Sequence, residues 1–384
     1  MKQLRFLLLT VACCIGLASC NNSIIPQNRL PLGMQTTAEP QQTHQPENKE
    51  PEKIVMERNY KISEITDSLK LHGRTLMESN GLACDASASG ISFAAYVEGD
   101  VKLTVTATAE TYFTVTVDGV RSTQRLKADA GTSVLTVASF ATGGEHEICV
   151  LKQTEARLSL CVLSNLQWKG YLNNAPAQKS FYIEFIGDSI TGGYGVLCAN
   201  GTANGGSAQY QDATQAFAYL TAQALNADHS LVNCSGMGLS KSLVSIPFVA
   251  TDLYSKQSKY RSESIAYTPT RTPDLVVINL GTNDSASGAS SSQFIKDAGA
   301  LIDLVRATYG KDVPIVWVYN MMNDSMYGSA RFAISAKGGE SAGIFTCEMT
   351  QNADGGVGHP SLTAQQAAAE RLASLIRSKN LIPS

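Results

Sequence analysis

The sequence predicts two folded parts: an all-β, jelly-roll-like sandwich, followed by an α/β domain with a three-layer, doubly wound parallel sheet. Residues 54–176 alternate apolar and polar side chains between Gly-rich turns, which is typical of half-buried strands. Beyond Lys179 short apolar runs alternate with helical patterns, which indicates a parallel sheet covered by helices. The chain has 384 residues, enough for two cores.

The first residues have the features of an export signal. Lys2 and Arg5 precede an apolar stretch over residues 6–17, which is too short to span a bilayer. Residues 17–20 read Leu-Ala-Ser-Cys and resemble the bacterial lipobox, which implies cleavage before Cys20 and acylation of that cysteine. The alternative is an ordinary secretory signal with an incidental cysteine. We expect an exported, membrane-anchored lipoprotein of the bacterial cell envelope, periplasmic or on the cell surface.

A polar, proline-containing segment follows this signal. It has no apolar periodicity and cannot bury enough surface to fold, so it is expected to be a disordered tether. The expected organisation is a signal peptide over 1–19, lipidated Cys20 and tether over 20–53, a β-sandwich over 54–176 and the α/β domain over 177–384.

Alternation is clearest in the middle of the predicted sandwich. Leu103 and Val105 face one side with Thr104 on the other, and Phe113 and Val115 repeat the pattern before the Asp-Gly turn at residues 118–119. About seven short strands are expected. Such a domain can bind a ligand or serve only as a structural companion of its neighbour, and the pattern leaves both uses open.

Charge and cysteine content exclude several classes. The net charge of −3 and the pI near 6.0 show no basic excess, so no nucleic-acid partner is expected. The cysteines beyond Cys20 form no CxxC pair and have no histidine at metal-ligand spacing, so we expect no zinc site. Cys149 and Cys161, on strands predicted to be neighbours, are the best disulfide candidates, but buried reduced thiols are favoured.

The second part shows short apolar runs of the buried-strand type at residues 182–186, 231–234, 275–280, 315–319 and 344–347. Helical patterns lie between these runs, and a last helix is expected from about residue 363 to 378. In such a sheet ligands lie beyond the carboxyl ends of the strands.

Ser189 follows the first of these runs directly. Gly187, Gly192 and Gly193 allow the backbone to turn sharply there, so Ser189 is a candidate nucleophile. The run Gly-Asp-Ser-Ile-Thr is not the Gly-x-Ser-x-Gly elbow of α/β-hydrolases. It resembles the first block of the SGNH, or GDSL, hydrolases, and the alternative is a purely structural turn.

Two later blocks extend this resemblance. Ser-Gly-Met-Gly at 235–238 and Gly-Thr-Asn-Asp at 281–284 each follow an apolar run. The resemblance assigns the Gly236 N–H and the Asn283 side chain to an oxyanion hole, with the N–H of Ser189 as a third donor. Pre-aimed donors stabilise the charge that develops on the carbonyl oxygen. Each block alone is equally compatible with an ordinary turn.

The fourth block, Gly-His-Pro-Ser at 358–361, precedes the last predicted helix, and His359 is the candidate base. The other histidines are His44 in the tether, His72 and His146 in the sandwich, and His229 in a predicted loop. Most SGNH enzymes carry an aspartate three residues before the histidine, where this chain has Gly356. The remaining candidates to orient His359 are the Asp354 carboxylate and a backbone carbonyl. We favour the carbonyl, and therefore a Ser–His dyad.

Taken together, the blocks and the upstream sandwich are similar to carbohydrate esterase family 2 over residues 70–384, including Lys-Gln-Thr-Glu-Ala at 152–156. The resemblance implies a serine esterase that removes O-acetyl groups from xylan, mannan or similar polysaccharides through an acetyl-enzyme, without a cofactor. Tyr194, Trp317 and Tyr319 are candidates for stacking on a sugar, and Trp317 and Tyr319 are equally compatible with the core.

Two other functions use the same blocks. One is a general SGNH lipase or thioesterase, although the loop over residues 199–209 is polar rather than an apolar flap. The other is a glycan-binding lipoprotein with a vestigial esterase site.

Overall fold

The computed structural model describes residues 53–383, and residues from Lys53 onward form one compact unit. Cys20, the signal peptide and the tether up to residue 52 lie outside the described residues. Within residues 53–383, no helix combines the length and the apolar character that crossing a membrane requires.

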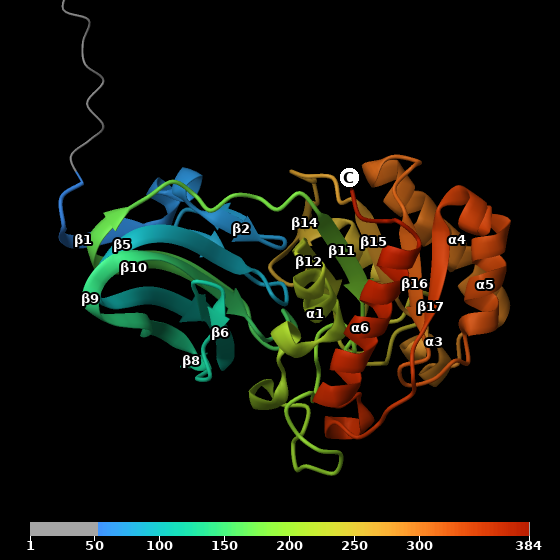
Figure 1. Cartoon of the computed structure of the whole chain (residues 1–384). Helices are drawn as coiled ribbons and strands as arrows, with labels where there is room; N and C mark the ends of the chain where they lie inside the picture. Colours follow the sequence, from blue (N-terminus) through green and yellow to red (C-terminus); the bar gives the residue numbers. More distant parts are fainter. Residues whose placement is uncertain (1–52, 384) are drawn as a thin grey trace, which may run out of the picture. The chain divides into compact units, whose positions relative to one another are not determined.

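The first part is a single antiparallel sheet of ten strands (Figure 1). The main strand order is β3-β4-β10-β5-β9-β6-β7, with β1 beside β10, β2 beside β5 and β8 beside β6. The bounds are β1 (Met56–Lys61), β2 (Lys70–His72), β3 (Leu76–Glu78), β4 (Gly81–Ala83), β5 (Gly90–Ala107), β6 (Thr111–Val117), β7 (Val120–Arg121), β8 (Leu126–Ala128), β9 (Gly131–Lys152) and β10 (Cys161–Leu172), with short 3-10 helices at Ile62–Glu64 and Thr66–Ser68.

The sheet has ten strands where about seven short ones were expected, and two of them are much longer than the sequence predicted. Strand β5 has 18 residues and β9 has 22, and their pairing shifts register between Val97 and Gly99 and between Val101 and Lys102. Such bulges bend long strands, so two strands replace what reads as several short ones. Leu103 and Val105 are fully buried, as the alternation predicted.

The expected neighbourhood of two cysteines is wrong. Strand β5 lies between β9 and β10, so Cys149 and Cys161 are not on adjacent strands. All the cysteines in the described residues are free thiols: Cys84, Cys149, Cys161, Cys198, Cys234 and Cys347.

The second part contains a parallel sheet of five strands in the order β12-β11-β15-β16-β17. The bounds are β11 (Tyr182–Gly187), β12 (Asp228–Asn233), β15 (Leu275–Asn279), β16 (Ile315–Tyr319) and β17 (Ile344–Glu348). Each contains or overlaps a predicted apolar run. Strand β12 begins earlier than predicted, so His229 lies in a buried strand and not in a loop.

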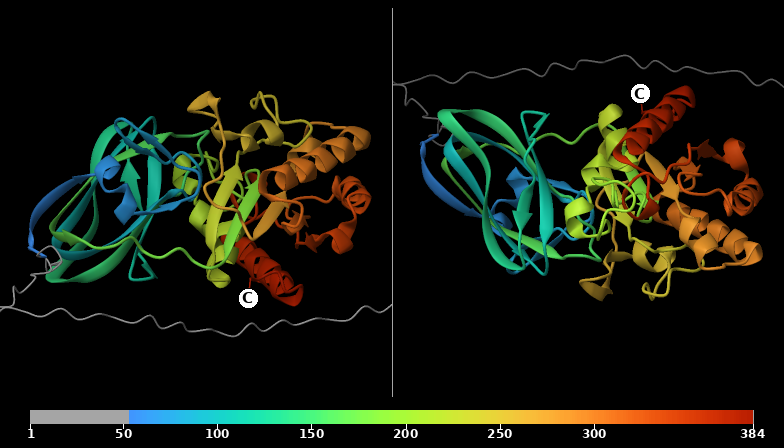
Figure 2. Two further views of the ribbon diagram at one scale, coloured as in Figure 1. Left: turned by 90° about the horizontal axis from the view of Figure 1, so that it is seen from above. Right: turned by 90° about the horizontal axis from the view of Figure 1, so that it is seen from below.

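Helices cover both faces of this sheet, which makes three layers (Figure 2). The helices α1 (Phe217–Ala224) and α6 (Leu362–Ser378) pack on one face, and α4 (Ser291–Tyr309) and α5 (Tyr327–Ala336) on the other. The remaining elements are α2 (Ala250–Tyr254), α3 (Thr282–Ala286), the hairpin β13 (Lys256–Ser258) and β14 (Ser262–Ala266), and 3-10 helices at Ala208–Tyr210, Ala213–Gln215, Gly339–Ala342 and Gly356–Gly358.

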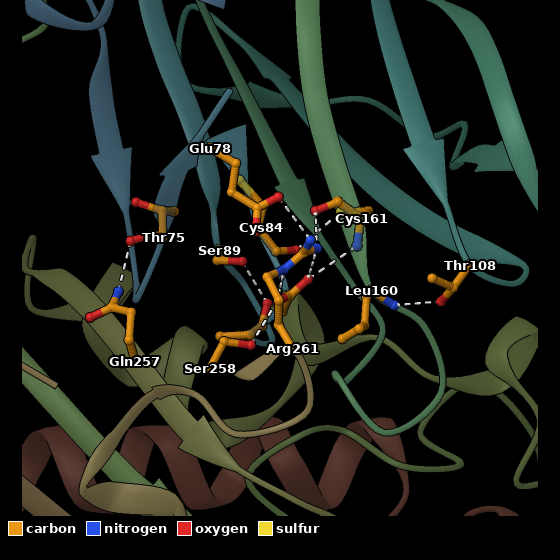
Figure 3. A network of polar contacts seen from close by, with 12 residues as sticks. Thr75, Glu78, Cys84, Ser89, Thr108, Leu160, Cys161, Gln257, Ser258 and Arg261 are labelled. Carbon is orange, nitrogen blue, oxygen red and sulfur yellow. Dashed lines mark hydrogen bonds and ion pairs between the residues drawn. The ribbon is translucent and has the colours of Figure 1, made fainter. Parts of the chain in front are cut away.

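Side chains cross between the two sheets in both directions. Arg261, between β13 and β14, places its guanidinium 2.7 and 2.8 Å from the two carboxylate oxygens of Asp85 and 3.0 Å from Glu78 (Figure 3). From the other side, Arg74 reaches the buried Glu184 at 3.3 Å. The Arg261–Asp85 pair is bidentate and such pairs have a defined geometry, so it orients the β13–β14 hairpin against the first part of the chain.

Candidate active site

The four sequence blocks meet at the carboxyl edge of the parallel sheet. Ser189 follows β11, Gly236 follows β12, and Asn283 lies in α3 directly after β15. These three strands are neighbours and run parallel, so their carboxyl ends lie at one edge. His359 reaches the same edge from the loop before α6.

Ser189 and His359 are hydrogen-bonded. The distance from Ser189 Oγ to His359 Nε2 is 2.8 Å, and Ser189 is 5% exposed. At Gly187 a side chain would collide with Thr191, so the sharp turn into Ser189 requires glycine there. The arrangement allows a neutral imidazole to accept the hydroxyl proton.

A backbone carbonyl holds the other ring nitrogen of His359. The Nδ1 atom lies 3.2 Å from the oxygen of Val357, which accepts its proton. Val357 has φ +56°, an unusual backbone conformation for a β-branched residue. Burial lowers the pKa of His359 below its usual 6.5, although this carbonyl bond acts in the opposite direction. The ring is therefore neutral near pH 7.

Asp354 does not lie at His359. Its carboxylate accepts a hydrogen bond from the side chain of Asn352 at 2.7 Å, and Asp354 is exposed. The position of the usual aspartate is closed, because a Cβ on Gly356 would lie 2.5 Å from the sulfur of Cys198 and 2.8 Å from the carbonyl of Gly205. The packing of this loop therefore excludes a side chain at residue 356.

Two of the three expected oxyanion donors are free. Within residues 53–383, neither the N–H of Ser189 nor that of Gly236 donates to a protein acceptor. Asn283 is engaged, since its Nδ2 donates to Asp188 at 3.1 Å and to the carbonyl of Met237 at 2.9 Å. Asn283 would have to exchange one of these bonds to reach an oxyanion.

Three buried carboxylates surround this edge, and the sequence reasoning assigned none of them a role. They are Asp188, Asp284 and Glu155, each at most 1% exposed. Burial raises the pKa of Asp188 to about 7, against the bond from the Ile190 N–H. Asp284 accepts three amide N–H groups, from Leu239, Ser240 and Lys241, at 2.8, 2.6 and 3.0 Å. The only signal in the sequence was that all three lie in motif runs.

The aromatic candidates differ in position. Tyr194 is half-buried, and its ring centre lies 4.8 Å from that of His359. Trp317 is fully buried and packs against Phe294, so it belongs to the core. Tyr319 stacks on Tyr327. Of the three, only Tyr194 lies beside His359.

The chain has a sandwich joined to a parallel sheet, with a Ser–His pair at the carboxyl edge of that sheet. This is the architecture of a carboxylic ester hydrolase. Comparisons with known proteins confirm this class. The model described as GDSL-like lipase/acylhydrolase family matches residues 185–379, about half of the chain, and the chain belongs to that family. The model described as carbohydrate esterase 2 N-terminal matches residues 71–176.

Individual relatives agree with this family. The cellulase/esterase CelE of Acetivibrio thermocellus is 29% identical over 319 residues, which cover 78% of this chain but only 38% of that protein. A family two carbohydrate esterase from Clostridium thermocellum, solved in complex with cellohexaose, is 27% identical with a TM-score of 0.76, over 81% of this chain and 99% of that one. An acetyl xylan esterase from Butyrivibrio proteoclasticus shares the fold at 20% identity, with a TM-score of 0.75 over 85% and 99% of the two chains.

Proposed function

We propose that the protein is a carbohydrate esterase that removes O-acetyl groups from xylan, mannan or related plant polysaccharides and oligosaccharides. The observation that carries the proposal is the 2.8 Å bond between Ser189 and His359 beside two unengaged N–H donors. The esterase names of the relatives and the saccharide bound to one of them support a sugar ester as substrate.

In the proposed reaction His359 Nε2 takes the proton of Ser189 as the Oγ attacks the acetyl carbonyl. The oxyanion accepts hydrogen bonds from the N–H groups of Ser189 and Gly236, and from Asn283 once its amide releases Asp188. The Val357 carbonyl stabilises the imidazolium. His359 then protonates the departing sugar hydroxyl, and water hydrolyses the acetyl-enzyme by the reverse sequence of proton transfers.

We also propose that the enzyme acts in the bacterial cell envelope. An acylated Cys20 would hold the enzyme in the bacterial cell envelope, and the segment over 20–53 would let it stand away from the membrane. Acetylated polymers outside the cytoplasm would then be within its reach.

The test is acetate release from acetylated xylan and acetylated glucomannan, resolved by NMR, with Ser189→Ala as the matched blank. We expect release from at least one polymer and a loss of about 10,000-fold or more in the blank. Undiminished release by Ser189→Ala would contradict the nucleophile. A wild-type protein that is inert on 4-nitrophenyl acetate but retained by xylan in affinity electrophoresis would instead favour a glycan-binding function.

A further inference from the structure

One carboxylate at the esterase edge comes from the sandwich and not from the α/β sheet. Glu155 closes the run Lys-Gln-Thr-Glu at 152–155, which begins with the last residue of β9 and leads toward β10. All four of these polar residues are at most 1% exposed. Consecutive buried polar side chains are costly unless each has partners, so the contacts of this segment indicate its purpose.

Glu155 binds the backbone next to the oxyanion donor. Its Oε2 accepts the N–H of Ser235 at 2.7 Å, a short bond of the charge-assisted kind. Its backbone N–H donates to the side chain of Gln211 at 3.4 Å, and the Gln211 amide lies 3.5 Å from Oε1. Glu155 therefore contacts the residue directly before Gly236.

The turn is held on its other side as well. The carbonyl of Gly236 accepts the N–H of Leu243 at 2.8 Å. Gly236 has φ +84°, and a Cβ there would lie 3.2 Å from the side chain of Ile246, so the conformation of this turn favours glycine. Ser235 is held through its N–H, and Gly236 is held through its carbonyl. The N–H of Gly236 lies between these two bonds and stays free.

The segment that presents Glu155 is itself rigidly built. Lys152 is fully buried, and its ammonium donates to the carbonyls of Asp85, Thr154 and Ser159 at 2.8, 3.0 and 2.6 Å. Three carbonyls satisfy all three donors of a lysine. The carboxylate of Asp85 accepts two hydrogen bonds from Arg261 of the β13–β14 hairpin. The segment is therefore connected to both parts of the chain.

Glu155 makes no direct ion pair within residues 53–383, although the buried ammonium of Lys152 is close enough to interact with its charge. Among the described residues no lysine, arginine or histidine forms an ion pair with it, and it lies near enough to Asp188 to contribute to the raised pKa of that carboxyl. A negative charge close to a developing oxyanion opposes catalysis. Its benefit must therefore come from the bond that it makes.

We propose that Glu155 is a positioning residue of the esterase, through which the sandwich orients the Gly236 N–H toward the oxyanion. The inference rests on the proposed function and deepens it. It gives the sandwich a part in catalysis without any contact to substrate, because an N–H stabilises the transition state only when it is aimed in advance.

The test compares Glu155→Ala with Glu155→Gln, whose amide oxygen still accepts the Ser235 N–H. Glu78→Gln is the matched control, because Glu78 contacts Arg261 at the same seam but bonds neither the turn nor residues 152–155, and Ser189→Ala is the blank. Each variant is assayed for kcat and KM on 4-nitrophenyl acetate and on the corresponding thionoacetate. The sulfur of the thionoester is a poor hydrogen-bond acceptor, so the ratio of the two rates reports on the oxyanion donors.

We expect Glu155→Ala to lower kcat about 10- to 100-fold with little change in KM, since removal of a whole donor costs about 100- to 1,000-fold. Its preference for the oxygen ester should fall in parallel. Glu155→Gln should stay within about fivefold of wild type. Glu78→Gln should lower Tm slightly but leave kcat and the ester preference unchanged.

Wild-type kcat in folded Glu155→Ala overturns the proposal, and so does an equal loss on both esters, which indicates a structural role only. Should Glu155→Ala fail to fold, Glu155→Asp replaces it, because its shorter side chain withdraws the carboxylate from Ser235. An unchanged ester preference in that variant also overturns the proposal. Undiminished hydrolysis by Ser189→Ala would instead reject the nucleophile, so the two failures are distinguishable.

Discussion

The two sides of Ser189 are supported in different ways. On one side lies the base loop, residues 352–359, and on the other the oxyanion turn, residues 235–243. The base loop is held by backbone groups close to the histidine, with the Val357 carbonyl at Nδ1. The oxyanion turn is held by buried carboxylates from distant segments, Glu155 and Asp284.

The base loop is held mainly through backbone groups, both from its own residues and from the segment over residues 195–200. The N–H of Gly356 donates to the carbonyl of Gly195 at 2.8 Å, and the N–H of Asn200 donates to that of Asp354 at 2.8 Å. One carbonyl is enough to select the tautomer of an imidazole, so this side needs no acid. The oxyanion turn must direct its N–H groups at one point, and isolated turns are too flexible for that. The difference shows why the carboxylates lie on the oxyanion side.

The largest expected effect distinguishes His359, the base, from Asp354, the carboxylate that was left as a candidate to orient it. His359→Ala should lower kcat about 1,000- to 10,000-fold, since among residues 53–383 the Ser189 hydroxyl has no other hydrogen-bond partner. Asp354→Ala should stay within about threefold of wild type, because its carboxylate bonds Asn352 and not His359. Steady-state kinetics of both variants on 4-nitrophenyl acetate measures the difference. Comparable losses in the two variants would mean that Asp354 orients the base.

A smaller effect is expected from the oxyanion turn. Asp284→Ala deprives three amide N–H groups of their acceptor and should lower the free energy of unfolding by about 2–5 kcal/mol, measured by urea denaturation. It should lower kcat about tenfold through the displaced turn. Asp284→Asn keeps one acceptor oxygen and is the matched control. It should lose less stability and less kcat than Asp284→Ala. Wild-type stability in Asp284→Ala would refute the support assigned to this carboxylate.

The smallest effect is a displacement of the pH profile. Burial lowers the pKa of His359 below 6.5, and the base must be neutral to accept a proton. The value of kcat/KM should therefore rise with pH through a midpoint below 6.5 and level off above it. Asp354→Ala should keep that midpoint, because an exposed carboxylate bonded elsewhere has little influence on the ring. A midpoint at or above 6.5 that persists in Asp188→Asn, where the neighbouring carboxyl with a pKa of about 7 is removed, would show that a negative charge stabilises the imidazolium.

Prediction from sequence was most successful where the signal was local. The strand Ile315–Tyr319 has the predicted bounds, and the helix Leu362–Ser378 begins one residue early. His229 was misplaced because the polar start of β12 conceals a strand that is buried along its whole length. The lengths of β5 and β9 were missed because bulges interrupt the alternation on which the count of strands depends.

The sequence by itself determined the order of the blocks, the two fold classes and the absence of an aspartate at residue 356. Each of these depends on residues close together in the chain. Only the tertiary structure decided which group lies at Nδ1 of His359 and which carboxylate holds the turn before Gly236. The Val357 carbonyl is only two residues from His359, but it reaches Nδ1 through the φ of +56° at Val357 in the folded loop. The Glu155–Ser235 contact joins segments whose proximity follows from how the two parts of the chain pack, and no local pattern encodes it.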